Sequence, residues 1–195
     1  MNAPQRIVLG VSGASGAAIA MRIAERLRAL EGVETHLVIS AAAQRTLFHE
    51  IGPDATDRLA QLADHLHAID DIGASIASGS FRSAGMIIAP CSMRSLGAIA
   101  TSLSDNLLVR AADVHLKERR PLVLLARESP LHLGHLRLMC TITELGAILA
   151  PPVPAFYLKP ATIAEIIDQI AARAIDLLAL DMPGQAEAWQ GESRP

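Results

Sequence analysis

Short apolar runs alternate with helical patterns along almost the whole chain. The runs occupy residues 6–11, 33–40, 86–90 and 121–126, and a shorter run, AILAP, occupies residues 147–151. Helical periodicity is predicted for the intervening stretches, which are residues 17–30, 41–50, 57–66, 93–100, 106–119, 133–145 and 162–180. Strands that are apolar on both faces and separated by helices are typical of a parallel sheet covered by helices on each side. The sequence therefore predicts a three-layer α/β fold.

The length of 195 residues fits a single domain, which we place at residues 1–182, followed by a loosely composed tail at residues 183–195. Charged residues make up only 19% of the chain and hydrophobic residues 51%. An average globular domain carries about 25% charged residues. We therefore expect part of the surface to be buried in a homo-oligomer.

Composition also excludes several classes of function. The net charge of −3 leaves no broad basic face for nucleic acid. No apolar run reaches the roughly 18 residues of a membrane helix, and the N-terminus lacks a secretion signal, so a cytoplasmic protein is expected. Two cysteines form no disulfide framework, and His132 and His135 have no evident third ligand, so no metal site is predicted.

In a parallel sheet of this kind, ligands bind beyond the carboxyl ends of the strands. The first such end is glycine-rich, IVLGVSGASGA at residues 7–17. It is neither a dinucleotide fingerprint, because Ser12 replaces the second glycine, nor a Walker A loop. The second strand ends in Ser40 rather than in an acid, which argues against NAD.

This loop favours the phosphate of a mononucleotide. The backbone N–H groups of residues 14–17 open a predicted helix, whose dipole favours an anion, and Ser12 and Ser15 add hydroxyl groups. Two alternatives stay open. The loop could be a tight turn without a ligand, or a nucleophile turn centred on Ser15, although no paired histidine is evident.

Other strand ends carry polar groups as well. Ser92 could donate to a ligand, whereas Cys91 has the pattern of a small buried apolar residue. Arg127 can bind a phosphate through its fork of donors, and Glu128 beside it could hold Arg127 or move a proton. The proline-rich PPVPAFY at residues 151–157 predicts a rigid segment that either presents Tyr157 to a ligand or serves as a structural lid.

Taken together, the motifs GVSGASGA, LVISAAAQ, APCSMRSL, RAADVHLKERRPLVLLARESPLHLGHLRLM and PPVPAFY resemble those of the UbiX-type flavin prenyltransferase family. This family includes the small subunits of aromatic-acid decarboxylase systems. The resemblance spans residues 6–180. It implies a flavodoxin-like or Rossmann-like sheet, bound FMN, and a dodecamer built from trimers.

The resemblance also implies a metal-independent reaction. Reduced FMN accepts a dimethylallyl group from dimethylallyl monophosphate at N5, and a ring then closes at C6. The product, prenylated FMN, serves a separate UbiD-type decarboxylase.

Site residues are implied position by position, and some of them would reach the site from neighbouring subunits. The residues expected to contact FMN are Gly13, Ala14, Ser15, Ser40, Cys91, Ser92, Met93, Arg94 and Arg127. Those expected to bind the prenyl phosphate are Ser78, Arg110, Lys117, Arg127, Glu128, Tyr157 and Arg173. Catalytic roles are expected for Glu128, Ser15, Glu50 and Tyr157.

The charges suit this chemistry, because a phosphate that leaves without magnesium needs side-chain cations, here Lys117, Arg127 and Arg173. The alternative is a flavoprotein that carries FMN, or that decarboxylates a substrate, without prenyl transfer. A weaker alternative is a structural subunit of a decarboxylase complex. A plain carrier has no need of a second phosphate pocket, so the cationic set favours the transferase.

Overall fold

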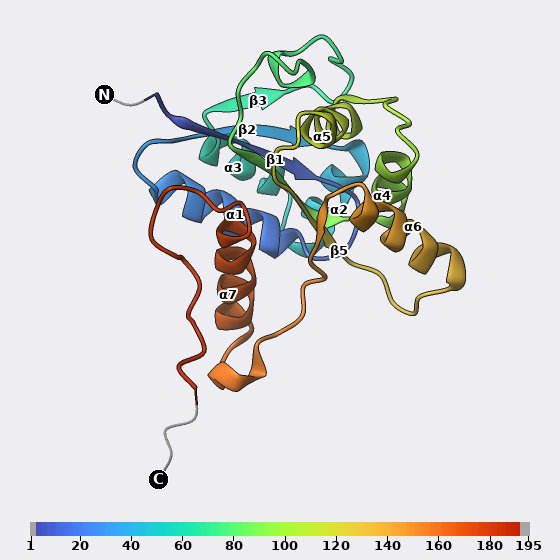
Figure 1. The fold of residues 1–195 in the computed structure, drawn as a ribbon. Helices are drawn as coiled ribbons and strands as arrows, with labels where there is room; N and C mark the ends of the chain where they lie inside the picture. Colours follow the sequence, from blue (N-terminus) through green and yellow to red (C-terminus); the bar gives the residue numbers. More distant parts are fainter. Residues whose placement is uncertain (1–2, 192–195) are drawn as a thin grey trace.

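The computed structural model describes residues 3–191 and contains one six-stranded parallel sheet (Figure 1). The strand order is β3-β2-β1-β4-β5-β6. The strands are β1 (Gln5–Val11), β2 (Val33–Ile39), β3 (His65–His67), β4 (Gly85–Cys91), β5 (Leu122–Ala126) and β6 (Ile148–Leu149). The predicted three-layer α/β fold is confirmed. Residues 1–2 and 192–195 of the predicted domain and tail lie outside the described residues.

Helices cover both faces of this sheet because its strands are apolar on both sides. One face packs against α1 (Ala17–Ala29), α2 (Ala41–Glu50), α3 (Ala55–Leu62) and α7 (Ile163–Asp176). The other face packs against α4 (Met93–Ala100), α5 (Leu107–Lys117) and α6 (Leu133–Glu144), together with the 3₁₀ turn η1 (Ser75–Ala77). A second 3₁₀ turn, η2, spans Phe156–Leu158. No helix in residues 3–191 is both long and apolar enough to cross a membrane.

Hydroxyl residues fix where several helices begin. The side-chain oxygen of Ser40 accepts the N–H of Ala43 at the start of α2, and that of Ser92 accepts the N–H of Ser95 at the start of α4. Such N-caps satisfy backbone donors that have no partner inside the helix. They place the first turns of α2 and α4 directly beyond the carboxyl ends of β2 and β4.

The chain reverses direction across the sheet at β1 and β4. After β1 the chain passes to α1 on one face, and after β4 it passes to α4 on the other face. Neighbouring parallel strands whose connections leave toward opposite faces form a switch point, where open α/β sheets bind ligands. The loops after β1 and β4 therefore border the expected ligand-binding crevice.

One predicted element is wrong. The sequence pattern predicts a helix over residues 57–66, but the helix α3 ends at Leu62 and β3 adds a strand to the sheet edge. Asp64, one of the two residues between them, decides the change: its carboxylate accepts the N–H of Thr35 at 2.8 Å, and its own N–H donates to the Thr35 carbonyl. These bonds align the following residues with β2, because partners on a neighbouring strand override weak helical periodicity.

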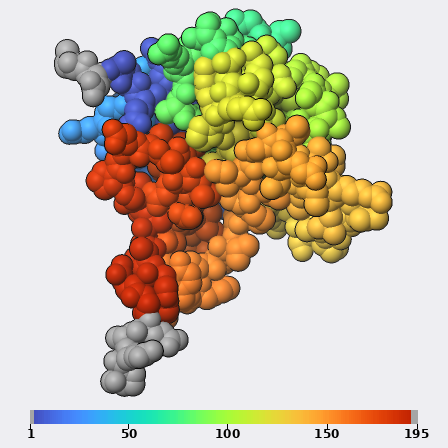
Figure 2. Space-filling model, in the orientation of Figure 1, coloured from blue at the N-terminus to red at the C-terminus, as the bar shows by residue number. Residues whose placement is uncertain are grey.

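The segment after α7 is more ordered than its composition suggests. The Asp176 carboxylate accepts the N–H groups of Gln185 and Ala186, and the Trp189 ring packs edge-on against Tyr157 at 5.4 Å. In Figure 2 this part of the chain (red) lies against the segment that contains residues 151–160 (orange). The described part of the tail thus belongs to the folded body.

Candidate functional site

Ser12 lies at the switch point and joins the loops after β1 and β4. Its buried hydroxyl donates to the Pro90 carbonyl at 2.9 Å and accepts the Ser92 N–H at 2.7 Å. Sequence reasoning offered Ser12 as a donor to a phosphate. The structure instead gives its proton to the protein, so Ser12 holds the two loops together.

The small residues of the glycine-rich loop are explained by the chain itself. A Cβ on Gly13 would lie 2.3 Å from the Cβ of Ala42, in the first turn of α2. Gly16 has a φ of +118°, a conformation that side chains other than glycine rarely adopt. The loop is therefore small because α2 packs onto it, and a ligand is not needed to account for its glycines.

Glu50 provides the anion at the N-terminus of α1. Its carboxylate, at the end of α2, accepts the N–H of Gly16 at 3.0 Å and that of Ala17 at 2.8 Å. Burial alone would raise the pKa of Glu50, but the hydrogen bond from Ser15, these N–H groups and the charge of Arg127 together lower the pKa. Ser15 and Glu50 thus lie together at the carboxyl edge of the sheet, with Arg127 near enough for its charge to act on Glu50.

This arrangement changes which backbone N–H groups are available to bind a phosphate. Of the four N–H groups at residues 14–17, that of Ala14 bonds to Ser12 and those of Gly16 and Ala17 bond to Glu50. The Ser15 N–H has no protein partner among the described residues. The N-terminus of α2, next to Gly13, offers further N–H groups at Ala41 and Ala42 beside the Ser40 hydroxyl.

The predicted residues after β4 differ in their exposure. Cys91 is fully buried, and burial raises the pKa of its thiol to about 12, so a thiolate is excluded. Ser92 and Met93 are partly exposed beside it. The Arg94 guanidinium is paired with Asp105. After β5, Arg127 and Glu128 are both exposed, and Glu128 accepts the N–H of Ser129 at 3.1 Å.

Tyr157 and Arg173 lie apart from this edge and line a pocket of 630 Å³ between the proline-rich segment, α7 and the tail. Trp189 closes the pocket from the tail side. Its contact with Tyr157 places it in this pocket.

Ser78, Arg110 and Lys117 form a third group, along α5 and the loop after η1. Arg110 donates to the Ala77 carbonyl at 3.2 Å and pairs with Asp113. Lys117 ends α5 and pairs with Glu118 at 3.1 Å.

Arg120 holds the loop of this third group. Its guanidinium donates to the Gly79 and Phe81 carbonyls, each at 2.6 Å. The sequence reading missed this role, because arginines at a helix end are usually solvated.

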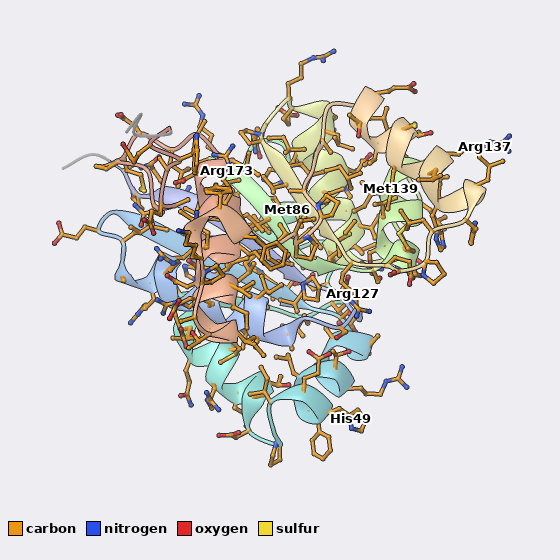
Figure 3. All side chains as sticks on the ribbon, turned by 90° about the horizontal axis from the view of Figure 1, so that it is seen from below. His49, Met86, Arg127, Arg137, Met139 and Arg173 are labelled. Atoms are coloured by element: carbon orange, nitrogen blue, oxygen red, sulfur yellow. The ribbon has the colours of Figure 1, made fainter. Side chains whose placement is uncertain are left out.

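A single chain does not bring this third group together with the Tyr157 pocket or with the residues around Arg127. Lys117 lies before the start of β5 and Arg127 directly after its end, so a strand of five residues, roughly 16 Å long, separates them. Arg127 and Arg173 also lie apart where Figure 3 labels them. The predicted substrate residues therefore lie in separate places on a single chain.

Comparison with known proteins gives consistent matches over nearly the whole chain. The Flavoprotein family model matches residues 1–174. A flavin prenyltransferase UbiX from Thauera aromatica is 58% identical over 177 residues, which cover 91% of this chain and 90% of the relative. A flavin prenyltransferase UbiX from Escherichia coli strain K12 is 51% identical and covers 96% of this chain and 99% of the relative.

Solved structures agree with these relatives. A crystal structure of AnUbiX in complex with FMN and dimethylallyl pyrophosphate has a TM-score of 0.91 and 46% identity, covering 97% of this chain and 100% of that one. A dodecameric FMN-dependent UbiX-like decarboxylase from Escherichia coli O157:H7 has a TM-score of 0.90 and 42% identity, covering 96% and 100%.

Proposed function

Because this chain belongs to the UbiX family of flavin prenyltransferases, we propose that it transfers a dimethylallyl group from dimethylallyl monophosphate to reduced FMN. The bond forms at flavin N5, a second bond closes a ring at C6, and inorganic phosphate leaves. The observation that carries the proposal is the placement of Ser15, Glu50 and Arg127 near one another at the carboxyl edge of the sheet, beside the N-termini of α1 and α2. A UbiD-type decarboxylase is the proposed consumer of the prenylated FMN.

FMN fits the donors that the protein leaves unused. We place its phosphate between the Ser15 N–H and the first turn of α2, where the N–H groups of Ala41 and Ala42 have no backbone partner among the described residues and lie beside Ser40. Gly13 lets these two elements approach each other. Helix N-termini favour phosphate through both their free donors and their dipole.

The residues of this edge can do specific parts of the work. Reduced FMN supplies the electron-rich ring that attacks the allylic carbon. Arg127 has no salt bridge within residues 3–191, so its guanidinium is available to a phosphate. The carboxylates of Glu50 and Glu128 are acceptors for protons released from the ring, with Ser15 beside Glu50 as a hydroxyl donor and acceptor.

An assembly of several chains would complete the site. Lys117 and Arg127 lie at opposite ends of β5, so both can serve one phosphate only if a neighbouring subunit brings its own Lys117. Large apolar side chains are exposed on and next to α6, among them Leu131, Leu133 and Leu136. We propose a homo-oligomer, in line with the dodecamer described for the Escherichia coli neighbour.

The central experiment is a transfer assay. Purified protein is mixed anaerobically with reduced FMN and dimethylallyl monophosphate in the presence of a chelator, and the flavin is analysed by mass spectrometry. We expect a flavin that is heavier by one prenyl unit. Dimethylallyl pyrophosphate is run in parallel, because the AnUbiX structure contains that molecule, and it separates the two donors.

The second candidate function is decarboxylation, because two solved neighbours are described as decarboxylases. One is from Escherichia coli and the other, at 34% identity, is from Aquifex aeolicus. A decarboxylase would release carbon dioxide from an aromatic acid and leave the mass of the flavin unchanged. A carrier would bind FMN and do neither. Unmodified flavin with both prenyl donors would reject the transferase proposal.

A further inference from the structure

Three histidines and a glutamate gather on one face of the sheet edge, away from the proposed flavin site. They are Glu34 and His36 on β2 and His65 and His67 on β3, and we refer to them as the edge-strand cluster. The parallel register pairs His36 with His65 and Val38 with His67. Because side chains alternate between faces along a strand, this register directs all four toward the same face.

The contacts within the cluster converge on one oxygen. Glu34 Oε1 lies 2.9 Å from His36 Nε2 and 3.3 Å from His65 Nε2. One ligand atom from each of Glu34, His36 and His65 lies within 4.8 Å of the others. Two ligands of a tetrahedral zinc ion with bonds of about 2.0 Å are roughly 3.3 Å apart, so small side-chain movements would admit such an ion.

We propose that Glu34, His36 and His65 bind a divalent transition-metal ion of the zinc class. Two imidazole nitrogens and one carboxylate oxygen suit zinc, whereas magnesium and calcium prefer ligand sets made of oxygen. His65 is half-exposed, which gives the ion an entry path and leaves a fourth position for water. The ion would hold the three-residue strand β3 against β2.

His67 completes the arrangement without binding the ion. Its Nε2 lies 2.9 Å from Nδ1 of His36, the ring nitrogen that faces away from Glu34. Metal-bound histidines usually donate their second ring N–H to such a partner, which fixes the tautomer. With the His36 proton on Nδ1, the lone pair of Nε2 points toward Glu34 Oε1, and a cation between these two acceptors removes their repulsion.

Neighbouring side chains pack against the cluster, and one of them is a cation that would compete with a metal ion for Glu34. The Phe81 ring packs edge-on against His36 at 5.0 Å. Arg6 stacks over Phe81 and also donates to Glu34 Oε1 at 3.3 Å. Arg6 is therefore the cation that a metal ion has to displace from Glu34.

The test measures zinc bound by protein without a polyhistidine tag, by equilibrium dialysis and elemental analysis. We expect one zinc ion per chain, at least tenfold weaker binding in His65→Gln, and about 10–100-fold weaker binding in His67→Ala. Arg6→Gln should bind zinc more tightly, because it removes the competing cation. Zinc should also slow amide hydrogen exchange at residues 65–67.

Two controls separate this site from other histidines. His132 and His135 form a close pair of tilted rings on and next to α6, with ring centres 3.6 Å apart, and His49 is exposed on α2, where Figure 3 labels it. The double variant His132→Gln/His135→Gln and the variant His49→Gln should keep the zinc of the wild type. Zinc that survives His65→Gln but is lost with either control overturns the proposal. Failure of the wild type to bind zinc also overturns it and identifies a cluster held by hydrogen bonds alone.

Discussion

The Glu50 carboxylate accepts the N–H of Ala17 at 2.8 Å, so the last residue of α2 closes the N-terminus of α1. A helix N-terminus directly after the first strand of a parallel sheet commonly binds a ligand phosphate. Here a side chain of the same protein occupies part of that binding site. This contact ties the two helices together and places a carboxylate beside Ser15 and Arg127.

Changing Glu50→Gln tests where the FMN phosphate binds. The amide keeps the shape but removes the charge from the N-terminus of α1. We expect FMN affinity to stay within about threefold of the wild type and the stability to fall by about 0.3–1 kcal/mol, the usual worth of such a charge. Flavin titration and chemical denaturation measure the two effects. Markedly tighter FMN binding would mean that Glu50 and the phosphate compete for the same N–H groups.

Ser15→Asp should abolish FMN binding without unfolding the protein. The new carboxylate would lie beside Glu50 and next to the proposed phosphate-binding site, so two negative charges would repel the phosphate dianion. We expect affinity to fall at least about tenfold, which is ~1.4 kcal/mol. Ser15→Ala is the matched control and should retain binding. Wild-type affinity in Ser15→Asp would remove the phosphate from this part of the molecule.

Glu128→Gln should separate catalysis from binding. Glu128 is exposed at the end of β5 and bonds only to the adjacent Ser129 N–H among the described residues, so the substitution leaves the fold intact. We expect FMN binding to persist and product formation to fall by about 10²–10⁴-fold, the typical worth of general acid–base catalysis. Tyr157→Phe removes one donor and should cost less, on the order of 1–3 kcal/mol. Single-turnover prenylation measures both, and a wild-type rate in Glu128→Gln would make that carboxylate structural.

A site shared between subunits predicts complementation. Lys117→Ala and Glu128→Gln should each be nearly inactive alone, because the first removes a cation for the leaving phosphate and the second removes a proton acceptor. Co-expressed chains that assemble at random should recover roughly a quarter of the wild-type sites, since some interfaces pair two intact residues. Transfer activity per chain measures this, and light scattering confirms that the mixture is oligomeric. Oligomers without any recovered activity would place Lys117 and Glu128 in the same chain's site, or in separate sites.

His115 predicts a loss of stability in acid. Its ring is buried, with Nδ1 2.7 Å from the Ala111 carbonyl and Nε2 2.8 Å from the Ser83 hydroxyl. Burial lowers the pKa of His115 from 6.5 to about 4. Between these pH values the unfolded chain binds more protons than the folded one, so stability falls as the pH drops, by up to about 3 kcal/mol.

Urea denaturation of the apoprotein at neutral pH and near pH 4 measures this loss. His115→Gln keeps one donor and one acceptor in place but does not titrate, so its stability should depend less on pH through this range. All other ionisable groups are common to both proteins. Equal pH dependence in wild type and variant would assign the acid sensitivity elsewhere.

Several features of this protein follow from local sequence alone. Apolar runs without alternation require burial on both faces, which only a parallel sheet between helices provides. Ser40 and Ser92 mark helix starts because a hydroxyl there satisfies backbone donors. The positions that follow each strand could likewise be named, because the carboxyl ends of parallel strands share one edge.

Contacts between distant segments decided the rest. Asp64 turns a predicted helix into a strand through Thr35, and Gly13 is small because of Ala42 rather than a ligand. The edge-strand cluster exists only because the register pairs β2 with β3. Periodicity records which face of an element is buried, but it carries no information about which element lies opposite. The sequence by itself therefore determined the layers and the candidate residues, while tertiary packing decided which of those residues meet.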